Sequence, residues 1–482
     1  MTYGLEHRLL IDGAWRETAR REPSLNPSDL SDTIGEYCWA GVGDVEEAVA
    51  AARRAQASWG RSNVQMRADL LRRAANAIYA NADALAELLA REEGKVRRDA
   101  RGEVIRTGQI FHFYSGETVR HAGGHFPSVR DGFNIVVEHE PVGVVALITP
   151  WNFPFATAAW KIAAALAYGN SVLFKPSEFT PACGAALAQI LTDAGVPAGV
   201  FNLLQGSGAE LGDALIDSTD AVSFTGSTPT GRRVLQRAAL DMKKVQLELG
   251  GKSPLVVLDD ADLDQAVQVA LDGAFYQTGQ RCTASSRLIA TRSIHDAFVD
   301  KLTAKVKALR VGHALAPGSE IGPVATEEQL TKDLSYVDIA RSEGAELMCG
   351  GEQLERPTDG YYLAPALFAG VTAKMRLAQE EVFGPVAGVI QAVDLDEALA
   401  IANDSEFALS SAICTTSLSA AEKFRRNVRA GMVVVNAPTS GAEYHVPFGG
   451  RSPSGYGARE QGAATAEFFT ETKTAYINHG VI

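Results

Sequence analysis

The chain has 482 residues, of which 46% are hydrophobic and 21% are charged. This composition is that of an ordinary globular protein and excludes a disordered chain, a collagen-like chain and a coiled-coil rod. Lys and Arg number 45 against 58 Asp and Glu, which gives a net charge of −13. Such an acidic chain argues against nucleic acid and against an anionic membrane as the main partner.

The length predicts about three domains or subdomains, at roughly 150 residues per domain. No targeting segment is expected, because residues 1–15 lack the apolar stretch of a signal peptide. The five cysteines are far apart and form no CxxC pair, which favours reduced thiols in a cytoplasmic protein. The uncharged run 141–160 could span a membrane by length, but its three prolines argue against a continuous helix there.

The N-terminal part predicts a short strand at Leu9–Ile11, followed by a hairpin turn at Asp12–Gly13. Three later stretches carry good helix formers and repeat apolar residues at helical spacing. We expect helices at 45–59, 65–89 and 98–114.

From residue 134, β-branched runs alternate with helical patterns. Strands are expected at 134–138, 142–148, 171–175, 200–204, 221–225 and 245–249, and helices at 183–194, 209–215 and 230–240. This rhythm predicts a parallel, doubly wound α/β sheet. A second alternating region, 253–436, includes expected strands at 255–258 and 432–435 and a helix at 263–278.

The last segment, 468–477, is typical of a strand but has no room for a core of its own. We expect it to pair away from the preceding sheets, with a partner subunit as one option.

Several familiar signatures are absent. Gly206, Gly208 and Gly212 form GxGxxxG, which is one residue longer than the usual dinucleotide fingerprint. No GxSxG elbow and no HExxH occur, so nothing indicates an α/β-hydrolase or a catalytic zinc, and no metal is predicted. A parallel α/β protein without these motifs still binds its ligand at the carboxyl ends of its strands.

Cys282 lies in the sequence GQRCT, after a helical pattern that we expect to end at Gly279. A loop held by a rigid scaffold is a common place for a nucleophile. A free thiol has a pKa of about 8.5, so Cys282 would need a nearby cation, a base or backbone dipoles to become a thiolate. Arg281 is adjacent in sequence, although its side chain can point elsewhere. The alternative is an inert reduced thiol.

Glu248, in LELGGKSP, is an acid at the end of an apolar strand. In partly apolar surroundings such a carboxyl has a raised pKa and can act as a base. The alternative is an ion pair with Lys252 or a helix cap. Asn152, in TPWNFP, is bracketed by two prolines, so its amide is a candidate oxyanion donor or simply bonds its own backbone. Lys175, in FKPSE, either binds a ribose or phosphate or is solvated.

Together, the motifs PWNFP, KPSE, FTGS, LELGGKSP, GQRC, EEVFGP and PFGG occur in this order over nearly the whole chain. The chain thereby resembles the NAD(P)-dependent aldehyde dehydrogenase superfamily. The resemblance implies an α/β fold with a Rossmann-like cofactor domain, an α/β catalytic domain and a small β oligomerisation element. The matching segments would be 1–122 with 143–252 for the cofactor, 253–436 for catalysis, 437–462 as a return segment between them, and 123–142 with 463–482 for oligomerisation.

The resemblance implies that Cys282 attacks an aldehyde to give a thiohemiacetal, that Asn152 stabilises the oxyanion, and that a thioester follows hydride transfer. Glu248 would then activate water for deacylation, which suits the chemistry of a covalent acyl stage. The implied catalytic set is Cys282, Glu248, Asn152 and Lys175.

The resemblance also implies a cofactor site for NAD, with NADP tolerated. Glu178 favours NAD, because a carboxylate accepts a hydrogen bond from a ribose 2′-OH and repels a 2′-phosphate. The implied cofactor-binding residues are Trp151, Lys175, Ser177, Glu178, Gly208, Phe224, Gly226, Ser227, Leu249, Glu381 and Phe383.

The substrate is implied less directly. Some family members that oxidise ω-carboxylated aldehydes carry an Arg where this chain has Trp160. The blocks GAEYHVPF, GQRCTASSR and REQGAATAEFF resemble α-ketoglutarate semialdehyde dehydrogenases, whereas Trp160 with Phe153 fits a betaine-aldehyde-type aromatic tunnel. Arg281 and Arg106 are candidates for binding a substrate carboxylate, or are structural. The implied pocket residues are Phe153, Trp160, Arg281, Thr283 and Phe448.

Two other classes stay open. A CoA-acylating transferase on the same fold commonly lacks the water-activating Glu, so Glu248 argues against it. A non-catalytic binding protein is disfavoured by the joint presence of Cys282, Glu248, Asn152 and Lys175. The resemblance further implies a homodimer or homotetramer that acts on a small aldehyde.

Overall fold

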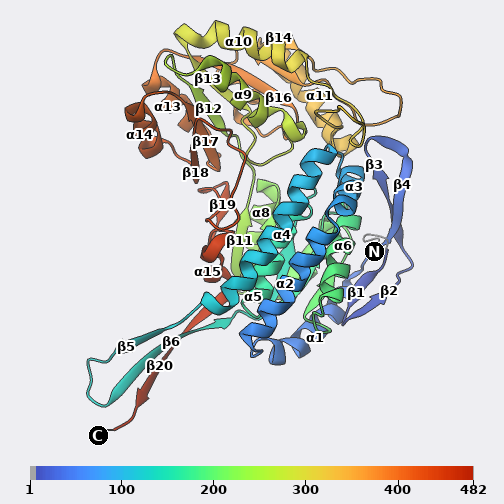
Figure 1. Ribbon diagram of the computed structural model, residues 1–482, viewed down its shortest axis with the longest axis vertical. Coiled ribbons are helices and arrows are strands. Elements are labelled where there is room, and N and C mark those ends of the chain that lie inside the picture. Colours follow the sequence, from blue (N-terminus) through green and yellow to red (C-terminus); the bar gives the residue numbers. More distant parts are fainter. Residues whose placement is uncertain (1–6, 481–482) are drawn as a thin grey trace.

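A computed structural model describes residues 7–480. Its first sheet has eight strands in the order β19-β11-β10-β7-β8-β9-β1-β2 (Figure 1). The five strands from β11 to β9 are parallel, and β1, β2 and β19 are antiparallel to their neighbours. The strands are β1 Leu9–Ile11, β2 Ala14–Arg16, β7 Val144–Ile148, β8 Ser171–Lys175, β9 Phe201–Leu203, β10 Ala221–Thr225, β11 Lys244–Glu248 and β19 Gly455–Tyr456.

Helices cover both faces of this sheet, which explains why its strands are continuously apolar. In β7, Val144, Ala146 and Ile148 enter one core, while Val145 and Leu147 enter the other. The first core lies under α1 Val42–Trp59, α7 Gly208–Ser218 and α8 Thr228–Ala239. The second lies under α2 Val64–Ala80, α3 Ala82–Glu93, α4 Arg97–Arg120, α5 Ala156–Ala167 and α6 Pro181–Asp193.

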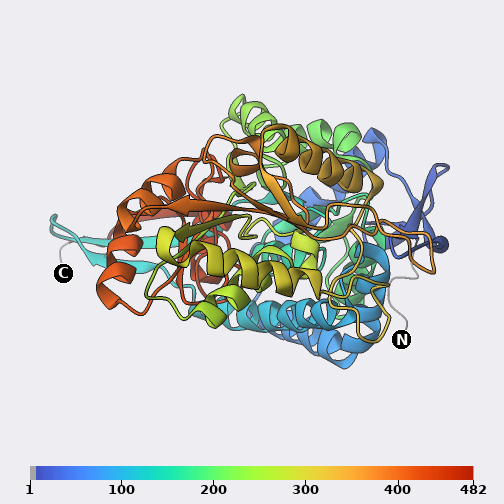
Figure 2. The ribbon, with the colours of Figure 1, turned by 90° about the horizontal axis from the view of Figure 1, so that it is seen from above.

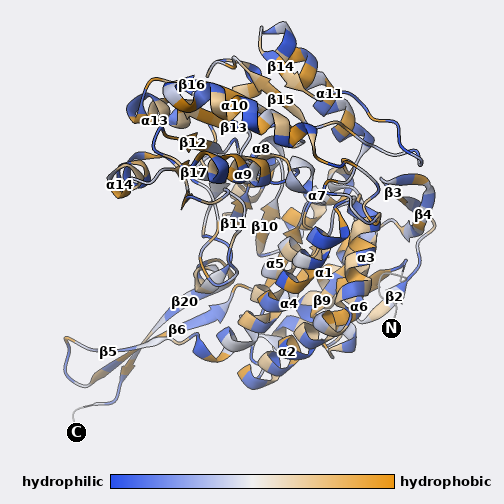
Figure 3. Cartoon of the chain, turned by 45° about the horizontal axis from the view of Figure 1, so that its top comes forward, coloured by the Kyte–Doolittle hydropathy of each residue, from blue (hydrophilic) through white to orange (hydrophobic). Residues whose placement is uncertain are grey.

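The second sheet has seven strands in the order β14-β15-β16-β13-β12-β17-β18, of which only β14 is antiparallel to its neighbour. The strands are β12 Pro254–Val257, β13 Arg287–Thr291, β14 Glu346–Cys349, β15 Ala366–Ala369, β16 Val386–Ala392, β17 Ser410–Cys414 and β18 Met432–Val435. One face packs on α9 Leu263–Ala274 and α10 Arg292–Lys307. The other packs on α11 Glu327–Ser342, α12 Arg376–Gln379, α13 Leu395–Asn403 and α14 Leu418–Asn427. Helices such as α2 and α10 show orange and blue sides in Figure 3, as amphipathic covering helices do.

A three-stranded antiparallel arm projects from the body (Figure 1). It consists of β5 Gly124–Pro127, β6 Phe133–Pro141 and β20 Thr470–Asn478, in the order β20-β6-β5. Seen from above, it lies at the end opposite the hairpin of β3 Arg21–Asn26 and β4 Asp29–Cys38 (Figure 2). The short helix α15 Ala466–Phe469 leads the chain into β20.

The predicted α/β class is confirmed, and two predicted elements need correction. The stretch 65–89 forms two helices, because Asn81 ends α2 and its side-chain amide donates to the carbonyl of Ala77 at 2.8 Å. The helix expected to reach residue 278 ends at Ala274, and the 3₁₀ turn Tyr276–Gly279 follows. The C-terminal strand pairs outside the two large sheets, as expected, and its partner is β6 of the same chain.

Within residues 7–480, no helix combines the length and the apolar character that crossing a bilayer requires.

Candidate active site

A cavity of about 560 Å³ lies where segments of the two large sheets meet. Trp151 follows β7, Thr225 ends β10 and Glu248 ends β11, and all three line the cavity. Because β7, β10 and β11 are parallel neighbours, their carboxyl ends meet at one edge, where α/β sheets bind ligands. Cys282 and Glu381 reach the same cavity from the second sheet's segments.

Cys282 follows a backbone turn that is unusual for its residue types. Gln277 and Thr278 have φ of 54° and 57°, in the left-handed region that β-branched residues rarely adopt. The turn is held by Thr278 Oγ1, which donates to the Gly322 carbonyl at 3.3 Å, and by Gln280 Oε1, which accepts from Ala325 N–H at 2.9 Å. The loop therefore presents Cys282 at a fixed point of the cavity wall.

The Cys282 thiol is partly exposed, and its pKa is raised well above the usual range. Burial is the main cause, followed by the negative charges of Glu248 and Glu381. Arg281 does not offset them by a direct bond, because one of its terminal nitrogens donates to the carbonyls of Asp272 at 2.5 Å and Gly273 at 2.9 Å. Burial and the two negative charges therefore disfavour the thiolate form of Cys282.

Glu248 is buried, and its Oε1 has no hydrogen-bond partner within residues 7–480. Burial raises the pKa of Glu248 well above its ordinary value, and the charge of Glu460 raises it further. The alternative ion pair with Lys252 is not formed, since the Lys252 ammonium also lacks a hydrogen-bond partner in the described chain. Glu460 is itself paired with Lys161. A carboxyl with a raised pKa facing a cavity is suited to proton transfer.

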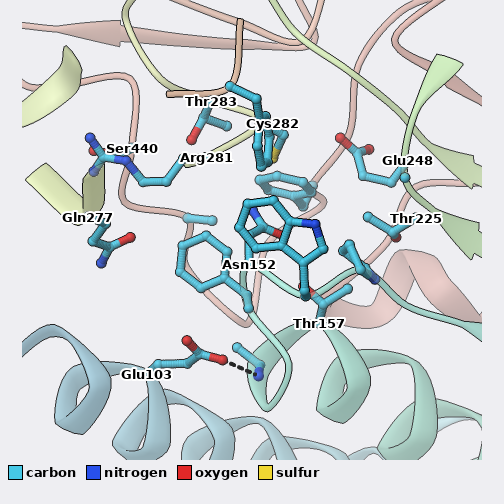
Figure 4. Close-up of a pocket in the computed structure, with 18 of the residues that line it drawn as sticks. Glu103, Asn152, Thr157, Thr225, Glu248, Gln277, Arg281, Cys282, Thr283 and Ser440 are labelled. Atoms are coloured by element: carbon cyan, nitrogen blue, oxygen red, sulfur yellow. Dashed lines mark hydrogen bonds between the residues drawn. The ribbon is translucent and has the colours of Figure 1, made fainter. Parts of the chain in front are cut away.

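Asn152 is held from two sides in a buried loop. Its side-chain amide donates to the carbonyl of Gln280 at 2.9 Å, so the amide lies next to the Cys282 loop. Its backbone carbonyl accepts from Lys95 Nζ at 2.6 Å. Lys95 pairs with Glu103 at 2.7 Å, and Glu103 caps the start of α5 through the backbone N–H groups of Phe155 and Ala156 (Figure 4).

Six of the predicted cofactor residues line the cavity, namely Trp151, Gly226, Ser227, Leu249, Glu381 and Phe383. Ser227 is the N-cap of α8, and a helix N-terminus is a site for phosphate. Glu381 accepts from Gly251 N–H at 2.8 Å, and a Cβ at Gly250 would come within 2.5 Å of the Glu381 carboxylate. Glycine at 250 is therefore needed for this close approach.

The other predicted cofactor residues lie outside the cavity lining. Lys175 is buried rather than solvated, and its ammonium donates to the Pro176 carbonyl at 2.7 Å and to Glu178 at 3.3 Å. Gly208 lies beside the Lys175 side chain. Ser177 is buried at the end of the same strand, and Phe224 is part of the core against Gly226.

The five predicted pocket residues all line the cavity: Phe153, Trp160, Arg281, Thr283 and Phe448. The rings of Trp160 and Phe448 lie 5.5 Å apart and form an apolar wall. Phe153 packs under Lys95, whose Nζ lies 4.2 Å from the ring centroid.

The sequence profile of the aldehyde dehydrogenase family matches residues 15–475. The chain belongs to the aldehyde dehydrogenase family. It is therefore an NAD(P)-dependent oxidoreductase, and the predicted membership is confirmed.

Among its relatives, the α-ketoglutaric semialdehyde dehydrogenase of Bacillus subtilis is 40% identical, with 97% of each chain covered. The α-ketoglutarate semialdehyde dehydrogenase of Haloferax volcanii is 41% identical, covering 97% of this chain and 98% of the relative. Among solved structures, betaine aldehyde dehydrogenase from Staphylococcus aureus in complex with NAD+ superposes with a TM-score of 0.96. It is 34% identical and covers 98% of this chain and 95% of that one.

Several residues of this aldehyde dehydrogenase's cavity region were not predicted from the sequence. Lys95 and Glu103 are charged residues that look solvated in sequence, yet both are buried under the Asn152 loop. Gln277 and Ser440 line the cavity. The proximity of Gln277 to Cys282 offered a signal for Gln277, whereas no local pattern indicates the position of Ser440.

Proposed function

We propose that this enzyme oxidises α-ketoglutarate semialdehyde to 2-oxoglutarate with NAD, by way of a thioester on Cys282. The observation that carries the proposal is the convergence of Cys282, Asn152 and Glu248 on one cavity that also holds Trp151, Glu381 and Phe383. A nucleophile, an oxyanion donor and a base are the groups that hydrolytic acyl chemistry needs.

In the proposed mechanism, Cys282 loses its Sγ–H proton to solvent as Sγ bonds to the aldehyde carbon, and Asn152 Nδ2 with the Cys282 N–H donates to the developing oxyanion. NAD, when bound, supplies the hydride acceptor that converts the thiohemiacetal on Cys282 into a thioester. Glu248 then takes a proton from the water that attacks the thioester, and the thiol is restored. Burial raises the pKa of Glu248 above its ordinary value, which makes its ionised carboxylate a stronger base.

The chain's own residues fit NAD on two observations. Ser227 is the N-cap of α8, a helix N-terminus that suits a phosphate, and Gly226, Ser227, Gly250 and Glu381 line the same cavity. In this proposal Gly226 and Ser227 meet the pyrophosphate, and Glu381 and Phe383 hold the nicotinamide end. Lys175, Ser177, Glu178, Gly208 and Phe224 form or support the adenosine end, and Glu178 favours NAD over NADP.

The substrate is supported by the relatives named for α-ketoglutarate semialdehyde, which match along nearly the whole chain. The betaine-type alternative has the lower identity of 34%. The CoA-acylating alternative is disfavoured by Glu248, which faces the cavity with an unbonded oxygen.

We also propose the division of labour implied by the resemblance. Segments 1–122 and 143–252 bind the cofactor, 253–436 carry the nucleophile, 437–462 return between them, and 123–142 with 463–482 join subunits in a homodimer or homotetramer. The cytoplasm is the proposed location, since the chain's cysteines suit a reducing compartment.

The test is the rate of NADH formation with α-ketoglutarate semialdehyde, succinate semialdehyde, betaine aldehyde and benzaldehyde, each with NAD and NADP. We expect kcat/KM for the first to exceed the others by about 100-fold. Cys282→Ala should abolish oxidation and leave NAD binding intact by calorimetry. Equal values across the panel would reject the substrate, and turnover by Cys282→Ala would reject the mechanism.

A further inference from the structure

The cavity has a polar end that the proposed chemistry does not use. Figure 4 shows Gln277, Arg281 and Ser440 on one side of the cavity, Glu248 and Thr225 on the opposite side, and Cys282 between them. Because Glu248 and Thr225 belong to the cofactor sheet, the opposite end is where the unreactive part of an aldehyde would extend.

Arg281 is a buried cation without an anionic partner. It is 8% exposed, and no carboxylate within residues 7–480 lies within ion-pair distance of its guanidinium. One terminal nitrogen bonds the carbonyls of Asp272 and Gly273, whereas Nε is buried with no hydrogen-bond partner in the described chain. Burial lowers the pKa of Arg281 to about 10, so the group is charged at neutral pH.

The nearest carboxylates do not take that role. Asp99 and Asp272 raise the pKa of Arg281 without forming an ion pair with it. Asp99 Oδ1 accepts from Arg98 at 3.1 Å, while Asp99 Oδ2 is buried with no hydrogen-bond partner in the described residues, and Asp272 accepts from Gln268 at 2.8 Å. A desolvated guanidinium costs free energy unless an anion meets it. The free Nε therefore favours an anionic ligand in the cavity.

Two neutral polar groups lie beside Arg281. Gln277 lines the cavity from the left-handed turn, and its side-chain amide makes no hydrogen bond within the described residues, which leaves its Nε2 group free to donate. Ser440 follows Thr439, which bonds the Thr283 carbonyl and lies 2.6 Å from Ser285 Oγ, so the Ser440 segment is pinned to the Cys282 loop. The left-handed backbone at Gln277 is strained, and such strain persists where the surroundings enforce it.

We propose that Arg281 binds the carboxylate of the semialdehyde substrate, and that Gln277 and Ser440 donate hydrogen bonds to its carboxylate and 2-oxo oxygens. The proposal rests on the proposed function and deepens it by naming what selects a 2-oxo acid. The guanidinium fork matches a carboxylate, and burial strengthens the bond. Trp160 and Phe448 form an apolar wall and offer no cation, so the anion site lies beside the nucleophile.

Arg106 provides the comparison. It lines the same cavity, has no ion pair in the described residues, and places its guanidinium carbon 5.5 Å from the centroid of Tyr444. In this proposal the Arg106 charge attracts an anionic substrate at a distance and does not contact the substrate carboxylate, which Arg281 binds. Loss of Arg106 should therefore have a smaller, salt-sensitive effect.

The experiment measures kcat/KM for α-ketoglutarate semialdehyde and for pentanal, an uncharged aldehyde of equal chain length. The wild type should prefer the semialdehyde. Arg281→Leu should lower the ratio of the two values by about 100-fold, the effect of losing a charged hydrogen bond. Arg281→Lys should recover about tenfold of that loss, and Arg106→Leu should lower the ratio by less than about fivefold.

Gln277→Leu serves as the second variant, because its side chain bonds no backbone group and its loss leaves the loop's hydrogen bonds in place. It should lower the ratio by about tenfold. A parallel fall of both substrates in the Arg281 and Gln277 variants would reduce these residues to loop supports and overturn the inference. A larger effect at Arg106 than at Arg281 would also overturn it. A wild type that oxidises neither aldehyde would instead reject the proposed function.

Discussion

Glu248 faces the cavity with one carboxylate oxygen unbonded, and charged groups around it set its protonation. Burial and Glu460 raise its pKa, while Lys161 and Arg459 lower it. Glu460 and Lys161 form a buried pair, and Lys161 also donates to Ser223 Oγ at 2.7 Å. The base of the proposed deacylation is thus tuned by a pair that does not touch substrate.

Glu460→Gln should move the acid limb of the kcat profile to lower pH. The substitution removes a negative charge that raises the pKa of Glu248 and leaves the positive Lys161 unopposed, so both effects lower that pKa. Because the ionised carboxylate is the active form, the variant keeps its activity to lower pH than the wild type. The measurement is kcat between about pH 5 and pH 9. Glu467→Gln, at an exposed glutamate of the same segment, is the control. A shift of the acid limb to higher pH in Glu460→Gln would contradict this prediction.

For single residues, the sequence could identify the candidate site residues but not the charged groups that pair near them. Glu248, Asn152 and Cys282 stand out locally, as an acid ending an apolar strand, an amide between prolines and a thiol after a helix. Lys161 and Glu460 are 299 residues apart, and each is an ordinary charged residue in its own segment. Their pairing follows from the return of the chain beneath the first sheet, which no local pattern encodes.

The loop between β7 and α5 is positioned by charged residues from the junction of α3 and α4. Gly94 ends α3 in the left-handed conformation, and Lys95 follows it into the interior. There Lys95 bonds the Asn152 carbonyl and Glu103, and Glu103 bonds the first N–H groups of α5. The junction thereby links one helix pair to Asn152, the proposed oxyanion donor.

Lys95→Met should lower the free energy of unfolding by about 3–5 kcal/mol, because it strands the buried Glu103 carboxylate without its cation. It should also lower kcat, since the Asn152 loop loses a bond to its backbone. Urea titration followed by circular dichroism measures the first effect. Arg97→Met is the matched control, because Arg97 and Glu87 form an exposed pair worth about 0–1 kcal/mol. Equal stability of the two variants would mean that the buried pair gives no net stabilisation.

Element types were largely predictable, whereas several element ends were not. The strand Ala221–Thr225 has the predicted bounds because both edges of its apolar run coincide with loop residues. Helical spacing continues through Asn81 and through Phe275 to Thr278, so periodicity predicted longer helices than the chain forms. Tertiary bonds to the turn after α9, such as that from Thr278 to Gly322, override the local pattern.

At the scale of the whole molecule, the alternating rhythm of strands and helices predicted two covered α/β sheets, and the tail pairs outside both of them, as expected. The apolar residues of 468–477 indicated a strand but not its partner. The register from Thr470↔Pro141 to Asn478↔Phe133 shows that β20 completes the arm of its own chain. The arm has β20 and β5 as its edge strands, and its face exposes a row of side chains.

That row carries the last prediction, which concerns assembly. Phe126 and Tyr476 both pair with Ile135 in the register, so the three side chains line one face across the arm. Phe126 is 50% exposed and Tyr476 is 61% exposed, and Arg130 lies 5.4 Å from the Tyr476 ring centroid. An apolar row on a projecting sheet is costly in water unless a second copy covers it. Tyr476→Glu should therefore weaken the proposed oligomer, because it replaces an apolar ring with a charge that must be desolvated at the interface, at a cost of several kcal/mol that Arg130 offsets only in part.

Light scattering after size exclusion would give the mass of each species. The wild type should measure as a dimer or tetramer and Tyr476→Glu as a smaller species with an unchanged circular dichroism spectrum. Leu418→Glu, which adds the same charge at an exposed apolar residue remote from the arm, should keep the wild-type mass. Since the arm is remote from the lining of the cavity, dissociation should lower activity much less than it lowers mass. A Tyr476→Glu enzyme of wild-type mass would place the subunit contact on another surface and leave the arm's apolar row without a role in assembly.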